Sequence, residues 1–177
     1  SLHEANIEVT DPDSLYVFYT PSEVSCFGYS DGSISINLSG GITPYKVNGV
    51  FLSSNDTIIS NLAAGEHLYT ILDSNNCIRP EDIITINEPN ILEIDTVLTQ
   101  VLCHGDSTGF IDLTITGGNP SYSYLWSNSD TTADLVNIVA GTYNVLVTDT
   151  KGCTENGIYI ITEPLSPIIS NIVETNI

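Results

Sequence analysis

Apolar and polar residues alternate in short runs along this chain, which is the pattern of half-buried β-strands. Isoleucine and leucine alternate with small polar residues at 33–38, and a similar alternation returns at 110–115. Aromatic residues alternate in the same way at 122–126. Glycine, asparagine and aspartate separate the runs as turns, and no run shows the 3.6-residue period of an amphipathic helix. The pattern therefore predicts an all-β chain.

The sequence also repeats itself at a spacing of about 76 residues, which is the size of a small domain. Both copies contain, in order, a C-x-G turn, an alternating strand, a Gly-Gly pair, a tyrosine, a strand run that ends near a cysteine, and Glu-Pro. We therefore expect two domains, at 13–89 and 90–164. The flanking residues, 1–12 and 165–177, resemble the closing strand of an upstream repeat and the opening strand of a following one.

Six or seven short strands in each copy predict tandem immunoglobulin-like β-sandwiches. The sequence has four cysteines, none in a C-x-x-C pair, which argues against zinc-ribbon and thioredoxin-like sites. An even number of cysteines in an acidic, Ser/Thr/Asn-rich chain predicts disulfides formed outside the cytosol. Three pairings of four cysteines are possible. Repeat symmetry favours one disulfide in each repeat, Cys26–Cys77 and Cys103–Cys153.

The charge of the chain is strongly one-sided. Three Lys+Arg against 22 Asp+Glu give a formal net charge of −19. Such a surface repels phosphate backbones and anionic lipid headgroups, so we expect neither nucleic-acid nor membrane-surface binding. No apolar run approaches the roughly 20 residues that a membrane-spanning helix needs, so we expect no membrane insertion either.

The order of motifs resembles the SprB repeat, a repeat of giant surface adhesins of gliding bacteria and related secreted proteins. The second copy carries it as GGNPSYSYLW at 117–126 and AGTYNVLVTDTKGC at 140–153, and the first copy has Pro44-Tyr45 after its Gly-Gly pair. The resemblance implies export by type IX secretion, display on the bacterial cell surface, and a role in adhesion or gliding motility. It implies no catalytic residues.

Two motifs could be taken for catalytic or metal sites. Both G-x-S-x-G matches, around Ser30 and Ser107, follow the first cysteine of a repeat and precede a strand. A hydrolase needs a strand before this motif and a helix after it, so we expect simple turns and no enzyme. The histidines His3, His67 and His104 are too scattered to form a ligand set, and His67 is expected at the edge of the core.

The acidic and hydroxyl residues suggest two further sites. Acidic side chains near the expected repeat junctions could bind structural calcium, although no EF-hand pattern is present; they are Asp11, Asp13, Glu88, Asp95 and Glu163. Asp-Ser/Thr followed by a small apolar residue or threonine resembles the O-glycosylation signal of the same bacterial group, and good turn chemistry is the alternative reading. The candidate acceptors are Ser14, Thr57, Thr96, Ser107 and Thr131. No other cofactor is expected.

The function that the sequence favours is a structural and adhesive segment of a large secreted bacterial surface adhesin, a semi-rigid stalk on the cell surface. Its expected partners are neighbouring repeats of the same chain, the secretion and surface-anchoring machinery, and surface polysaccharide. The alternative is that each repeat is a carbohydrate-binding module with exposed aromatic side chains. We expect these side chains in the core instead; they are Tyr122, Tyr124, Trp126 and Tyr159.

Overall fold

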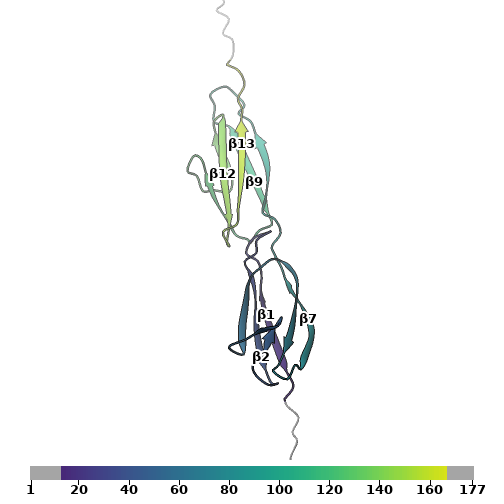
Figure 1. The fold of residues 1–177 in the computed structure, drawn as a ribbon. Helices are drawn as coiled ribbons and strands as arrows, with labels where there is room; N and C mark the ends of the chain where they lie inside the picture. The colour runs from purple at the N-terminus through teal and green to yellow at the C-terminus, as the bar shows by residue number, and fades with distance from the viewer. Residues whose placement is uncertain (1–12, 167–177) are drawn as a thin grey trace, which may run out of the picture. The chain divides into compact units, whose positions relative to one another are not determined.

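The computed structural model describes residues 13–166, and these divide into two compact units after Glu88. Every regular element within those residues is a β-strand, as the alternation predicted (Figure 1). No described segment forms a helix that is long and apolar enough to cross a membrane. The strands expected for 1–12 and for 165–177 lie outside the described residues, apart from Leu165 and Ser166.

The first unit holds seven strands in two antiparallel sheets. The strands are β1 (Tyr16–Ser22), β2 (Gly32–Ser39), β3 (Lys46–Val47), β4 (Val50–Phe51), β5 (Asp56–Leu62), β6 (Gly65–Leu72) and β7 (Ile78–Ile86). One sheet has the order β1-β2-β5 and the other β4-β3-β6-β7. Consecutive strands are thus divided between two sheets that share one core, which is the arrangement of an immunoglobulin-like sandwich.

The second unit repeats this topology without a counterpart of β4. Its strands are β8 (Glu93–Thr99), β9 (Gly109–Thr116), β10 (Tyr122–Trp126), β11 (Leu135–Ile138), β12 (Gly141–Asp149) and β13 (Thr154–Ile161). The sheets have the orders β11-β9-β8 and β10-β12-β13. The prediction of tandem immunoglobulin-like sandwiches is therefore confirmed.

The additional strand β4 comes from an Asn-Gly turn. Asn48 and Gly49 both have positive φ, 48° and 80°, and Val47 pairs with Val50 across them. Asn-Gly is the preferred pair for a two-residue hairpin because both residues tolerate left-handed backbone. The second repeat lacks this pair, and its strand β10 continues instead to Trp126.

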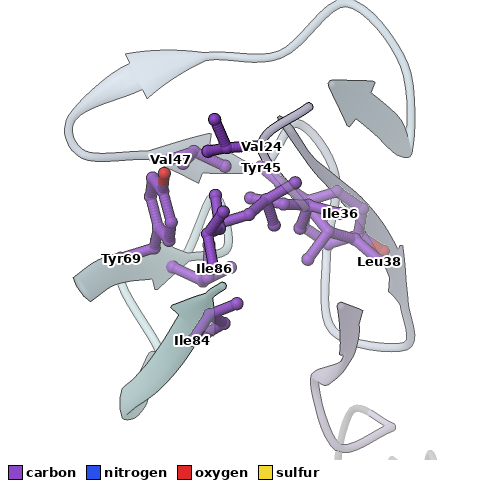
Figure 2. Packing of buried hydrophobic residues seen from close by; sticks show 10 residues of the cluster. Val24, Ile36, Leu38, Tyr45, Val47, Tyr69, Ile84 and Ile86 are labelled. Carbon is purple, nitrogen blue, oxygen red and sulfur yellow. The ribbon is translucent and has the colours of Figure 1, made fainter. Parts of the chain in front are cut away.

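The core of the first unit is built from the inward positions of both sheets. Ile34, Ile36 and Leu38 alternate along β2 and are at most 4% exposed. Figure 2 shows Ile36 and Leu38 directed towards Ile84 and Ile86, which come from β7 in the other sheet. Period-two alternation in the sequence therefore marks which side chains leave water.

The second core has the same plan with a larger aromatic group. Trp126, at the end of β10, is 2% exposed and packs with the inward residues of β9 and β12. Its indole N–H donates to the carbonyl of Thr132 at 2.9 Å, so the one polar atom of the ring is satisfied.

Candidate functional site at the two ends of each repeat

The C-x-G motif of the first repeat forms a turn at one end of the sandwich. Gly28 has φ +75°, and its N–H donates to Oε2 of Glu88 at 2.6 Å. The N–H of Ser25 donates to Oδ1 of Asp31 at 2.9 Å. Hydrogen bonds from the Ser25 hydroxyl and N–H lower the pKa of Asp31. The glutamate of the Glu-Pro pair therefore holds the turn that carries Cys26.

The second repeat builds the same turn from its own residues. The N–H of Gly105 donates to Oε2 of Glu163 at 2.6 Å, and the N–H of Leu102 donates to Oγ1 of Thr108 at 2.9 Å. His104 Nδ1 lies 3.3 Å from Oε1 of the same glutamate. These contacts explain the C-x-G-x-x-[D/T]-G pattern. They support the turn interpretation of both G-x-S-x-G matches, because each lies in this turn and a strand follows it.

The last glycine of the motif is fixed by packing. A Cβ at Gly109 would lie 2.8 Å from the Ile138 carbonyl oxygen and 2.9 Å from Cγ2 of Ile161. A Cβ at Gly32 would meet the carbonyl oxygen of Leu62 at 2.9 Å. No side chain fits at these strand starts, so the motif glycine is needed for close approach of the strands.

A buried aspartate closes the opposite end of the first sandwich. Asp73 is 1% exposed and follows β6. It accepts the N–H groups of Asn75 and Cys77 at 2.9 Å each, and that of Ile42 at 3.1 Å. Burial alone would raise its pKa, but the N–H donors of Cys77, Ile42 and Asn75 outweigh burial, so the pKa of Asp73 is lowered.

Asp149 does the same in the second repeat, where it is 6% exposed. Its Oδ1 accepts the N–H groups of Lys151 and Cys153 at 2.8 and 2.9 Å, and its Oδ2 accepts the Asn119 N–H at 2.7 Å. Burial raises the pKa of Asp149, and these hydrogen bonds lower it. The hydrogen bonds outweigh burial, so the pKa of Asp149 is lowered. A D-x-x-x-C turn of fixed shape therefore carries the later cysteine of each repeat.

The residues between the units are bound to one unit or the other. Glu88 holds Gly28 of the first unit, as described above. On the other side of Pro89, the carbonyl of Asn90 accepts the N–H of Gly118 at 2.9 Å, and Leu92 is 7% exposed. Pro89 itself has a ring-fixed φ. Nearly all of the short backbone that joins the units therefore makes contacts within one unit or the other.

The predicted pairs Cys26–Cys77 and Cys103–Cys153 are wrong. Cys77 and Cys103, one cysteine of each predicted pair, carry exposed free thiols. The sandwich explains why. Cys77 directly precedes β7, and the Cys26 turn is tied to Glu88, which follows β7.

The length of β7 then rules out a disulfide within the first repeat. At about 3.3 Å a residue, its nine residues separate the two ends by about 30 Å. A disulfide requires Cα atoms within about 7 Å. The eight residues of β13 separate Cys153 from the Cys103 turn by about 26 Å in the same way. Sequence symmetry shows which cysteines of the two repeats are equivalent. It does not show that the two cysteines of one repeat lie at opposite ends of its sandwich.

The candidate glycosylation acceptors differ in accessibility. Ser14, Thr96, Ser107 and Thr131 are exposed, whereas Thr57 is half-buried and lies opposite the fully buried Ile36. Thr96 is on β8, and its hydroxyl donates to the carbonyl of Asp112 at 3.2 Å. Modification at these positions stays a prediction, and Thr57 is the least accessible of the five.

The residues considered for calcium do not form a ligand set among the described residues. Within 13–166, no three Asp, Glu, His or Cys side chains gather as metal ligands would. The carboxylates of Glu88 and Glu163 each accept a hydrogen bond from a glycine N–H of their own unit. Asp11 and His3 lie outside the described residues. His67 is half-buried on β6, with Nε2 2.9 Å from the Ala63 carbonyl oxygen, which agrees with a position at the core edge.

The aromatic residues considered for carbohydrate binding belong to the core. Trp126 is buried, and its ring centroid lies 6.2 Å from that of Tyr159. Tyr122, Tyr124 and Tyr159 are half-buried and pack against the same cluster. The Tyr122 hydroxyl donates to the Gly117 carbonyl at 2.6 Å, as the Tyr45 hydroxyl does to Gly40 in the first repeat. These rings therefore do not form an exposed stacking platform.

Comparison with solved structures finds chains that are similar at low sequence identity. A 282-residue C-terminal fragment of intimin, solved with the intimin-binding domain of its translocated receptor, is 11% identical with a TM-score of 0.43. The match covers 87% of this chain and 64% of that one. The eight N-terminal Ig domains of Down Syndrome Cell Adhesion Molecule are 12% identical over 87% of this chain and 25% of that one, with a TM-score of 0.41.

A third similar structure is the amphioxus IgVJ-C2 molecule. It is 17% identical over 86% of this chain and 98% of that one, with a TM-score of 0.35. The chain thus spans less than two thirds of the intimin fragment and a quarter of the eight-domain fragment. No curated protein matches the sequence.

The sequence matches one protein family at two places. The family model of the SprB repeat matches residues 19–46 and residues 96–131. The first segment runs from β1 through the C-x-G turn to β3, and the second runs from β8 through the corresponding turn past β10. The resemblance found from the motifs is confirmed there, since each unit of this chain contains a segment that matches the SprB repeat.

Proposed function

We propose that this chain is a non-catalytic spacer and adhesive segment of a large secreted bacterial surface protein. It acts as a semi-rigid stalk that holds other parts of the protein away from the cell, in surface attachment or gliding motility. Export by type IX secretion and an extracellular location on the cell surface belong to the same proposal. Its partners are neighbouring repeats, the secretion and anchoring machinery, and surface polysaccharide.

The junction between the units carries this proposal. Each repeat ends on a glutamate that is hydrogen-bonded to its own C-x-G turn, at Glu88 and at Glu163. The residues after Pro89 are bound to the second unit through Asn90 and Leu92. Few backbone torsions of this linker lie outside those contacts, in contrast to a flexible Gly/Ser tether. Such a junction suits a stalk.

The size and surface of the repeats fit the same role. Strands of eight or nine residues at about 3.3 Å each give a sandwich roughly 30 Å long, so tandem copies extend a protein with little sequence. The net charge of −19 keeps such a surface soluble and disfavours contact with acidic polymers. The aromatic residues of the carbohydrate-binding alternative lie in the core, so no observation favours that alternative.

A repeat replacement tests the spacer role in the parent protein of the producing bacterium. Residues 13–164 are exchanged for two unrelated immunoglobulin-like domains of equal length, and surface attachment and gliding are measured. A spacer predicts that the replacement retains attachment while deletion of the same residues reduces it. If the replacement is as defective as the deletion, the repeats bind a ligand themselves and the spacer proposal is wrong.

We also propose O-glycosylation at the exposed Asp-Ser/Thr positions. Sugars at Ser14, Thr96, Ser107 and Thr131 would lie on the surface, where they add bulk without disturbing the cores. Intact mass of the protein from the producing bacterium tests this. The expected result is one or more sugar masses above the polypeptide mass, reduced stepwise by Thr96→Ala and Thr131→Ala. A mass equal to that of the polypeptide would overturn it.

A further inference from the structure

The outer face of the β1-β2-β5 sheet carries two exposed aromatic rings. Tyr16 and Phe18 are 61% and 67% exposed, whereas Val17 between them is half-buried. The period of two along β1 directs both rings away from the core, and their positions are about 7 Å apart along the strand. Single exposed apolar side chains are common, but exposed apolar side chains that gather on one face mark interaction sites.

Polar side chains stand beside these rings on the adjacent strands. Phe18 pairs with Asn37 of β2, and Asn37 pairs with Asp56 of β5, so the three form one row across the sheet. Tyr16 pairs with Ser39 of β2 on the same face. All three polar residues are exposed, and within residues 13–166 none of their side chains is used in a hydrogen bond or an ion pair. Their polar atoms are therefore available to a ligand.

The rings and the polar side chains line one open hollow of about 470 Å³. Its other lining residues are Val17 and Leu38. Small-molecule sites in proteins have volumes of about 300–1,000 Å³ and combine apolar walls with a few polar groups. Every lining residue belongs to the first unit, so this hollow is a feature of one sandwich by itself.

We propose that this hollow binds a neutral polysaccharide, with sugar rings stacked on Tyr16 and Phe18. One face of a pyranose ring presents C–H groups, whose slight positive charge complements the negative face of an aromatic ring. Sugar hydroxyls both donate and accept hydrogen bonds. The Asp56 carboxylate accepts such bonds, and the Asn37 amide both accepts and donates them. A purely apolar ligand would instead leave these two polar groups without partners.

The charge of the chain selects neutral over acidic sugars. The net charge is −19, and Asp56 lies in the hollow, where no lining residue is basic. A polymer of uronic acids or sulfated sugars would therefore be repelled. A second copy of this chain is disfavoured as the occupant for the same reason. The inference rests on the adhesive part of the proposed function and names the class of ligand.

The second repeat has the corresponding sheet but not this site. Glu93 and Asp95 of β8 take the places of Tyr16 and Phe18, as the pairing of β8 with β9 shows. Both carboxylates are exposed and offer no ring for stacking. The site therefore belongs to the first repeat alone. It differs from the alternative in which each repeat binds carbohydrate through rings that lie in the core.

Affinity electrophoresis in native gels tests the site, because a neutral polymer retards a bound protein without altering its charge. The full chain is run in gels that contain dextran, mannan, hydroxyethylcellulose or galactomannan, with alginate as the acidic comparison. We expect at least one neutral polymer, and not alginate, to retard it. Tyr16→Ala and Phe18→Ala should each weaken the apparent affinity by about tenfold or more. Phe51→Ala is the matched control and should bind like the unsubstituted chain, since Phe51 is 62% exposed and lies outside the hollow.

The urea midpoint of each variant checks its folding, and changes at these exposed positions should leave it nearly unchanged. Unchanged migration of the unsubstituted chain in every neutral polymer would overturn the proposal, as would equal retardation of that chain and the two ring variants. Self-association that Phe18→Ala abolishes, without retardation by any polymer, would also overturn it and assign the face to contact between copies. Failure of the repeat replacement on cells would leave the retardation unaffected, and absence of retardation would leave the spacer role standing.

Discussion

Asp73 and Asp149 are buried carboxylates, and neither forms a salt bridge within residues 13–166. Their charge is stabilised by backbone N–H groups of the turn that follows β6 or β12. The sequence pattern singled out neither carboxylate. Burial follows from the sandwich, because the Gly-Gly segment of the neighbouring loop covers each aspartate.

These two carboxylates predict an acid limit of stability. The folded-state pKa of each is lowered, so each stabilises the fold above its unfolded pKa of about 3.9. That stabilisation is lost as the pH falls below about 4 and through the folded pKa. The urea midpoint should therefore fall between pH 5 and 3. In the double variant Asp73→Asn/Asp149→Asn, the urea midpoint should be lower than that of the parent chain near pH 7, and it should fall less on acidification.

The exposed Asp95→Asn is the control for that experiment, since it removes one negative charge without a buried hydrogen-bonded turn. It should keep the acid dependence of the parent chain. Acidification also relieves repulsion within a chain of net charge −19, which acts in the opposite direction in every variant. An equal fall in midpoint for the double variant and the parent would show that these aspartates do not set the acid limit.

The strand-start glycine gives a second prediction at the same scale. Gly109→Ala places a methyl group 2.8 Å from the Ile138 carbonyl oxygen, so a strand must shift. We expect a loss of about 2 kcal/mol in the free energy of unfolding, as for overpacked cores. Gly141→Ala is the matched control, because the nearest atom to its Cβ is 3.6 Å away. Denaturant unfolding compares them, and equal stabilities would contradict the packing argument.

At the scale of the strands, the alternation of β10 predicts which side chains carry stability. Trp126 is 2% exposed, whereas the adjacent Leu125 is 56% exposed on the other face. Trp126→Ala should cost about 3–5 kcal/mol, and Leu125→Ala less than about 0.5 kcal/mol. Acrylamide should quench the native indole only weakly. Strong quenching, or similar costs for the two variants, would place Trp126 outside the core.

The strands and cores were largely predictable from the sequence, and the cysteine connectivity was not. Period-two alternation located β2, β9 and β10 because burial on one face of a sheet imposes that period. The additional β4 has a local sequence signal in Asn48-Gly49, which the alternation of apolar and polar residues does not contain. Which end of a sandwich holds each cysteine depends on strand direction and sheet order, and repeat symmetry contains neither.

The two cores have no residue in common, which has a consequence for the whole molecule. The first cluster contains only residues of the first unit, and the second contains only residues of the second unit. Each core can therefore be weakened separately. Trp126 is the single tryptophan, so its fluorescence reports on the second unit alone.

Equivalent substitutions in the two cores test this independence. Ile34 and Ile111 occupy corresponding positions of β2 and β9, and both are fully buried. Each change to alanine removes the same atoms and should cost about 2–5 kcal/mol in its own unit. Under reducing conditions, Ile111→Ala should lower the denaturant midpoint of tryptophan fluorescence, and Ile34→Ala should leave it unchanged. Far-ultraviolet circular dichroism follows both units. For Ile34→Ala it should show that the first unit unfolds at a lower denaturant concentration than the second. A fluorescence midpoint lowered equally by both variants would mean that the repeats unfold as one cooperative body, and a stalk would then lose its whole length when one repeat is damaged.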